Sequence, residues 1–134
     1  MALEPGGAGV LAAVASRDGP TPASLGKLVD HALDEAAGTA GTRPLPSSIG
    51  VGLAGWIDRG GVVRRSPHLP ELVGVDPALW LGERFGVPAV LENDANCAAV
   101  AALASMGEQP RCLLAVTIGT GIGAGFVVDG EPVS

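Results

Sequence analysis

The chain has 134 residues, of which 47% are hydrophobic and 16% are charged, a composition typical of a folded domain and not of a disordered segment. Only 3% of the residues are aromatic, so we expect a core of Val, Leu, Ile and Ala. The formal net charge is −6 and the longest basic run is Arg64-Arg65, which argues against nucleic-acid binding by this segment.

Residue patterns predict a series of helices and strands in the first two thirds of the chain. Thr21 and Pro22 mark the start of a helix, and Gly38 is expected to end it. A second helix should begin after the capping residue Asp76 and end near Gly86. The elements expected in this part are a helix over residues 22–37, strands over 48–53 and 61–65 around a turn at 54–60, and a helix from 77 to near 86.

The next informative stretch is a junction between a short buried strand at residues 88–91 and an alanine-rich helix that runs through Met106. Either Asn93 or Asp94 can cap this helix. The junction therefore presents a carboxylate and amides where ligands commonly bind in α/β folds. A carboxylate that accepts a hydroxyl proton, beside amides that hold neighbouring hydroxyls, suits phosphoryl transfer to a sugar. The alternative is that Asp94 only caps the helix.

Near the C-terminus, a glycine loop at residues 119–125 separates two apolar runs at 113–118 and 126–128. The glycines match the dinucleotide-binding spacing formally, but that motif requires a following helix, and the residues after the loop favour a strand. The pattern is therefore strand, glycine loop, strand. Backbone N–H groups can surround a phosphate where side chains are absent, so the loop is a candidate phosphate cradle. A tight hairpin without a ligand is the alternative.

Together these segments resemble the ROK family (repressor, open reading frame, kinase), which includes bacterial glucokinases. The resemblance covers roughly residues 47–134, and it rests on LENDANCAA at residues 91–99, TIGTGIGAG at 117–125, IGVGLAGWID at 49–58, and GVV and SPHLP at 61–63 and 66–70. It implies an α/β fold of the actin-like ATPase (ribonuclease H-like) superfamily. Residues 1–109 would form part of the smaller, sugar-side lobe, and residues 110–134 would open the nucleotide lobe.

The same resemblance implies an ATP-dependent kinase that transfers the γ-phosphoryl group to a hydroxyl of glucose or an N-acetylhexosamine, with Mg²⁺ bridging the phosphates. Asp94 would be the catalytic base. The substrate-binding residues would be Asn93, Gly55 and His68, and the nucleotide-binding residues Gly119, Thr120, Gly121 and Gly123. His68 stands where the family usually has Asn, so a surface loop histidine remains the alternative there. Trp56 could belong to the core or form a sugar-stacking surface.

Several family motifs are absent from the chain: the Asp-x-Gly-Gly-Thr phosphate hairpin, the Glu-x-Gly-His sugar ligands and the Cys/His zinc cluster. We therefore expect a fragment of a larger protein, inactive by itself and with no metal site of its own. The alternatives are a ROK-type sugar-sensing transcriptional regulator whose DNA-binding part is not in this chain, or an inactive remnant. The family also implies a homodimer or homotetramer.

Cys97 and Cys112 lack the spacing of a metal site, so we expect both to be free buried thiols, as in a reducing cytoplasm. The opening residues have no basic segment that would mark a signal peptide, and no stretch has the length of a membrane-spanning helix. We therefore expect a cytoplasmic location and no membrane partner.

Overall fold

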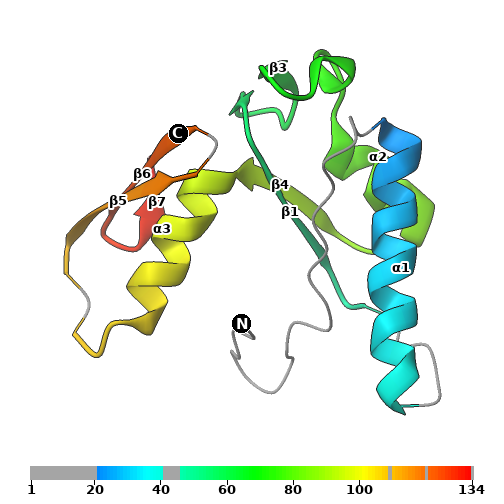
Figure 1. The fold of residues 1–134 in the computed structure, drawn as a ribbon, viewed down its shortest axis with the longest axis horizontal. Helices are drawn as coiled ribbons and strands as arrows, with labels where there is room; N and C mark the ends of the chain where they lie inside the picture. The colour runs from blue at the N-terminus through cyan, green and yellow to red at the C-terminus, as the bar shows by residue number, and fades with distance from the viewer. Residues whose placement is uncertain (1–20, 41–45, 109, 120, 134) are drawn as a thin grey trace.

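The computed structural model describes residues 21–40, 46–108, 110–119 and 121–133, which form a mixed α/β fold (Figure 1). Its elements, in chain order, are α1 Pro22–Ala40, β1 Ile49–Leu53, β2 Trp56–Ile57, β3 Val63–Arg65, the short 3₁₀ helix Pro70–Leu72, α2 Pro77–Phe85, β4 Ala89–Asn93, α3 Asp94–Ser105, β5 Cys112–Ile118, β6 Ile122–Val128 and β7 Glu131–Pro132.

The first layer is a parallel pair of strands, with β1 beside β4 in a register that runs from Ile49 opposite Ala89 to Leu53 opposite Asn93. Helices α1 and α2 lie together on one side of this pair (Figure 1). The core between them contains Leu25, Ile49, Leu53, Val63, Leu72 and Leu81. Because β1 and β4 are parallel, their carboxyl ends lie side by side. The turn after β1 is therefore brought next to the start of α3.

The boundaries of the helices test the capping predictions. Helix α2 is capped as expected, since Asp76 Oδ1 accepts a hydrogen bond from Leu79 N at 2.9 Å and Gly86 ends the helix with φ of 69°. The stop expected at Gly38 is wrong, because α1 continues through Ala40. A glycine inside a helix costs only about 1 kcal/mol relative to alanine, so it need not end one. The turn expected at residues 54–60 contains the short strand β2, which pairs with β3.

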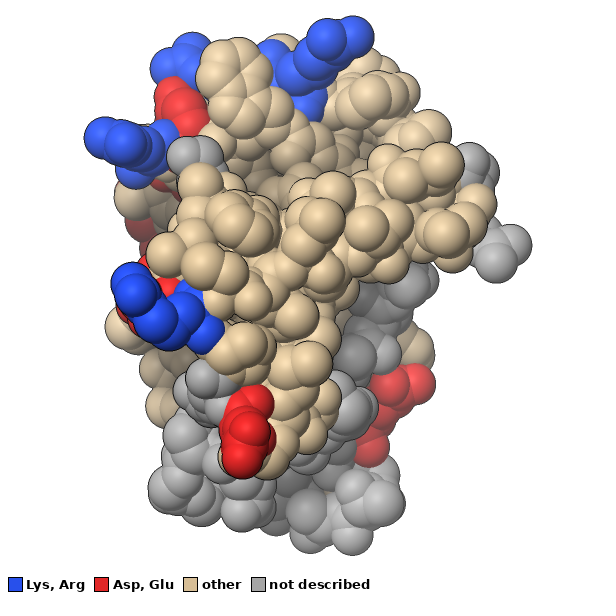
Figure 2. Space-filling model, turned by 90° about the vertical axis from the view of Figure 1, so that its left-hand side faces the viewer, with Lys and Arg blue, Asp and Glu red and all other residues tan. Residues whose placement is uncertain are grey.

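The second layer is a three-stranded antiparallel sheet in the order β5-β6-β7. Its main part is the hairpin β5–β6, whose register runs from Cys112 opposite Val128 to Ile118 opposite Ile122. One face of the hairpin packs on α3, and a small core of Ala99, Leu103 and Val127 lies between them. The other face is exposed, with Ile118 at 82% and Ile122 at 81% exposure. Figure 2 views this side of the molecule, and its centre is occupied by uncharged residues.

Candidate functional site

A cavity of about 740 Å³ lies where the two layers meet, around the first residues of α3. One side, which we call the β2–β3 wall, consists of Ala54, Gly55, Trp56, Arg65, Pro67 and His68. The opposite side, the hairpin wall, consists of Thr117, Ile118, Gly119, Gly121, Ile122, Gly123 and Ala124. Asn93, Asp94 and Ala95 complete the lining. In Figure 1, β3 and the hairpin lie on two sides of the junction between β4 and α3.

This cavity brings together the site residues that were predicted from distant segments of the sequence. Gly55, His68, Asn93 and Asp94 line it, and so do the loop glycines Gly119, Gly121 and Gly123. Thr120 lies outside the described residues. The segments converge because β1 and β4 end at the same edge and α3 then packs against the hairpin.

Asn93 is the residue that caps α3. Its Oδ1 accepts hydrogen bonds from Ala95 N at 2.9 Å and Asn96 N at 3.2 Å, and its Nδ2 donates to Gly55 O at 3.0 Å. These bonds satisfy both acceptor sites of the amide and one of its two N–H donors. The side chain therefore fixes the turn after β1 to the start of α3, and its second N–H has no partner among the residues that the structure describes.

Asp94 is the first residue of α3 and its side chain is exposed in the cavity. Its Oδ1 accepts a hydrogen bond from Ala95 N at 2.9 Å. No hydrogen bond to Oδ2 comes from the part of the chain that the structure describes, so this oxygen can accept a hydroxyl proton from a molecule in the cavity. Asn93 is thus the cap of α3, and Asp94 also accepts a hydrogen bond from one of the first N–H groups of the helix.

Gly55 has a structural reason to be glycine. A Cβ built on it would lie 2.6 Å from Arg65 O and 3.2 Å from Ser66 Cβ. Ser66, which is buried, donates a hydrogen bond from Oγ to Ala54 O at 2.7 Å and holds the same turn. The backbone of the turn is thus packed directly against the strand that follows, and His68, which is exposed, extends this wall of the cavity.

The loop glycines look alike in the sequence, but the structure divides them into two groups according to whether a Cβ would fit. A Cβ on Gly125 would collide with the backbone of Ala95, and one on Gly123 would lie 2.7 Å from Thr117 Oγ1 and 3.2 Å from Ala95 Cβ. These two residues are glycines because the hairpin packs closely on α3. A Cβ on Gly119 or Gly121 would meet no atom within 4 Å, and neither residue has a positive φ.

Packing against the described residues therefore does not account for glycine at 119 or 121. Both line the cavity, where the absence of side chains lets a ligand approach the backbone. The N–H of Gly119 donates to Gly121 O at 2.9 Å, so a bound group would use other backbone donors of the loop.

Sequence reasoning missed some of the residues at the cavity and its surroundings. Arg65 was noted only as part of a basic pair, although it lines the β2–β3 wall. The core alternative for Trp56 is wrong, because its side chain is 65% exposed and lies in the same wall.

Glu92 is a further residue that the sequence did not single out. Its Oε1 accepts hydrogen bonds from Asn93 N at 2.7 Å and from Nδ2 of the buried Asn96 at 3.0 Å, which holds the backbone of the capping residue in place. Glu92 and Asn96 are four residues apart in the sequence, and this spacing could have indicated that their side chains meet.

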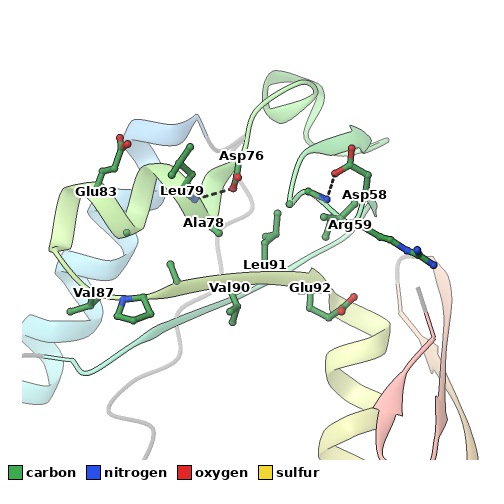
Figure 3. A pocket seen from close by; sticks show the side chains of 16 residues that line it. Asp58, Arg59, Asp76, Ala78, Leu79, Glu83, Val87, Val90, Leu91 and Glu92 are labelled. Carbon is green, nitrogen blue, oxygen red and sulfur yellow. Dashed lines mark hydrogen bonds between the residues drawn. The ribbon is translucent and has the colours of Figure 1, made fainter.

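A second cavity, of about 760 Å³, lies between β4, α2 and the turn before β3 (Figure 3). Its carboxylates belong to Asp58, Asp76, Glu83 and Glu92. Asp76 and Asp58 are already engaged, by Leu79 N and by Arg64 Nε respectively. None of the substrate- or nucleotide-binding residues predicted from the sequence lines this cavity.

The two thiols are free, but their predicted burial is only partly correct. Cys97 is half-buried, whereas Cys112 is exposed because the hairpin's outer face is uncovered. Burial raises the pKa of Cys97, and the charges of Glu92 and Asp94 raise it further. Within residues 21–40, 46–108, 110–119 and 121–133, no group of three His, Cys, Asp or Glu side chains could hold a metal ion. Over the same residues, no helix has the length and hydropathy needed to span a membrane.

Comparison with known proteins gives a family match: the model of the ROK family matches residues 15–134. A β-glucoside kinase from Listeria monocytogenes is 39% identical over 78 residues, which are 58% of this chain and 24% of that protein. An N-acetylmannosamine kinase from Salmonella arizonae is 31% identical over 119 residues, which are 86% of this chain and 40% of that protein.

Solved structures of similar fold include an inorganic polyphosphate/ATP-glucomannokinase from Arthrobacter sp. strain KM, with a TM-score of 0.69 and 30% identity over 84% of this chain and 46% of that one. A ROK hexokinase from Thermus thermophilus has a TM-score of 0.69 and 32% identity over 92% of this chain and 41% of that one. The chain thus spans less than half the length of the relatives it matches.

Proposed function

Because the chain belongs to the ROK family and has part of its actin-like ATPase fold, we propose that the protein containing it is an ATP-dependent sugar kinase. The acceptor would be a hydroxyl of a hexose of the glucose or N-acetylhexosamine type. The relatives that carry this proposal are a β-glucoside kinase, an N-acetylmannosamine kinase and an ATP-glucomannokinase.

The observation that best supports the proposal is the shared cavity of Asp94 and the open glycines Gly119 and Gly121. Phosphoryl transfer requires a group that orients the attacking hydroxyl and a separate site for the phosphates of the donor. Asp94 would hold the acceptor hydroxyl and take its proton, while Asn93 would donate its remaining N–H to a neighbouring hydroxyl. Gly119 and Gly121 would hold the donor's phosphates, and ATP with Mg²⁺ supplies the phosphoryl group and neutralises its charge when bound.

We further propose that the lobes divide near residue 109, with residues 1–109 on the sugar side and 110–134 opening the nucleotide side. Helix α3 would then connect the two, since it follows β4 directly and shares a core with the hairpin. A shift of the hairpin relative to β4 would change the separation between Asp94 and the glycine loop.

The test is Asp94→Asn in the protein expressed from its complete reading frame. We expect turnover to fall at least about 100-fold, the usual effect of losing a catalytic base, while calorimetry shows sugar binding preserved. Asp129→Asn is the matched control, because Asp129 is an exposed aspartate that pairs with Arg111 at 2.8 Å and does not line the cavity. Unchanged turnover in Asp94→Asn would contradict its role as the base. Sugar binding by the unaltered protein without any turnover would instead favour a sugar-sensing regulator.

A further inference from the structure

Two adjacent arginines on β3 have different surroundings. Arg64 is paired, with its Nε 2.6 Å from Asp58 Oδ2. Arg65 lies opposite Trp56 in the β2–β3 register and lines the cavity together with it. Trp56 pairs with Arg65 and Ile57 pairs with Val63, so Arg64 is an extra residue without a partner on β2. At such a bulge the regular alternation of side chains is interrupted, and the two arginines meet different surroundings.

Arg65 also lacks the carboxylate partner that other arginines have. Arg84 Nη2 lies 2.9 Å from Asp30 Oδ2, and Arg111 Nε lies 2.8 Å from Asp129 Oδ1. Within the described ranges, no ion pair involves Arg65. Arg59 is also without an ion pair there, but in Figure 3 it points away from the second cavity. Arg65 is therefore an unpaired guanidinium on a cavity wall, and Asp94 is the only carboxylate among the described residues of that cavity.

We propose that Arg65 binds a carboxylate or phosphate group carried by the acceptor sugar, at a position away from the hydroxyl that reacts. The guanidinium forms a planar set of donors that matches either anion with two parallel hydrogen bonds. Trp56, 65% exposed beside it, offers an apolar ring surface for the sugar itself. This inference rests on the proposed kinase function and specifies the class of acceptor.

The position of Arg65 assigns it to the acceptor and not to the donor. It belongs to the same wall as Gly55 and His68, and it follows a turn whose backbone is tied to Asn93 by the bond from Nδ2 to Gly55 O. The open glycines of the loop belong to the opposite wall. An anionic group on the sugar would therefore reach Arg65 while the reacting hydroxyl meets Asp94.

The experiment compares binding of three probes by calorimetry without nucleotide: glucose, glucuronic acid and glucose 1-phosphate. We would measure the unaltered complete protein, Arg65→Met and the matched control Arg64→Met. Thermal unfolding of each protein shows whether it is folded. We expect at least one anionic probe to bind the unaltered protein about ten-fold or more tightly than glucose, as a charged hydrogen bond allows. Arg65→Met should lose this preference, and Arg64→Met should keep it.

The two anionic probes carry a carboxylate at C6 and a phosphate at C1, so the tighter of the two gives the preferred combination of anion and ring position. If Arg65→Met fails to fold, Arg65→Gln takes its place with the same expectation, and Arg65→Lys should restore part of the preference. The proposal is overturned if glucose binds as tightly as both anions, or if the preference survives in Arg65→Met. A separate titration measures a non-hydrolysable ATP analogue without sugar, and the proposal is also overturned if Arg65→Met weakens the binding of that analogue alone. None of these measurements depends on turnover. The proposal for Arg65 can therefore be contradicted while the kinase proposal, which Asp94→Asn tests, still holds.

Discussion

The two walls of the cavity are held in place by different kinds of interaction. The β2–β3 wall depends on side-chain hydrogen bonds, from Asn93 Nδ2 to Gly55 O and from Ser66 Oγ to Ala54 O. The hairpin wall depends on the close approach of Gly123 and Gly125 to Ala95. The first wall is therefore sensitive to the removal of polar atoms, and the second to the addition of a methyl group.

The walls also differ in what supports them from behind. The β2–β3 wall rests on a core that includes the fully buried Val63, Leu72 and Leu81. The hairpin packs on α3 with one face, and its outer face exposes Leu114, Val116, Ile118 and Ile122. Apolar patches of this kind are usually contact surfaces. The comparison predicts that the hairpin wall is the more easily displaced of the two.

The largest loss of stability is expected from Gly125→Ala, which alters the support of the hairpin wall. The added Cβ would collide with the backbone of Ala95, and overpacking of this kind forces backbone shifts that cost about 3 kcal/mol. Gly121→Ala is the matched control, since a Cβ there meets nothing within 4 Å. Urea unfolding of both variants measures the difference. Equal stability of the two variants would show that the hairpin does not depend on close packing against α3.

A smaller effect is expected from Asn93→Ala, which removes the cap of α3 and the bond to Gly55 O together. Loss of a cap usually costs about 1–2 kcal/mol of unfolding free energy. Asn93→Asp is the matched control, because its carboxylate still accepts from Ala95 N and Asn96 N but cannot donate to Gly55 O. We expect Asn93→Asp to retain most of the stability in urea unfolding while sugar affinity falls in both variants. Full sugar affinity in Asn93→Asp would contradict the positioning role of the Gly55 bond.

The smallest effect is expected from Asp58, in the turn before β3, whose contribution to stability should depend on pH. Hydrogen bonding from Val62 N, from the Arg64 guanidinium and from Gly60 N lowers the pKa of Asp58 below its ordinary value of 3.8. A lowered folded-state pKa means that this carboxylate stabilises the fold above pH 3.8 and that the contribution disappears as pH falls through the folded value. The unfolding temperature of Asp58→Asn should therefore lie slightly below that of the unaltered protein at pH 7, and the gap should close in acid. A gap that stays constant with pH would contradict this account.

Local chemistry was sufficient to predict several elements. Asp76, Pro77 and Gly86 mark the two ends of α2 because caps act within one turn of a helix. The strand, glycine loop and strand near the C-terminus appear as β5 and β6 for the same reason, since alternation and turn residues are local signals. By contrast, the predicted burial of Cys112 is wrong and the choice left open for Trp56 needed the structure, because the exposure of each side chain depends on neighbours that are distant in the sequence.

The sequence by itself determined the class of fold, the family resemblance and the short list of candidate residues, since motifs and periodicities are properties of adjacent residues. Only the tertiary structure decided that Gly55, Asn93, Asp94 and the loop glycines share a cavity, because parallel pairing of β1 with β4 joins segments that lie far apart in the chain. It also separated Gly125, whose backbone packs directly on Ala95, from Gly121, where an added Cβ would meet no described atom within 4 Å. That distinction depends on distances between backbones, and no local pattern encodes them.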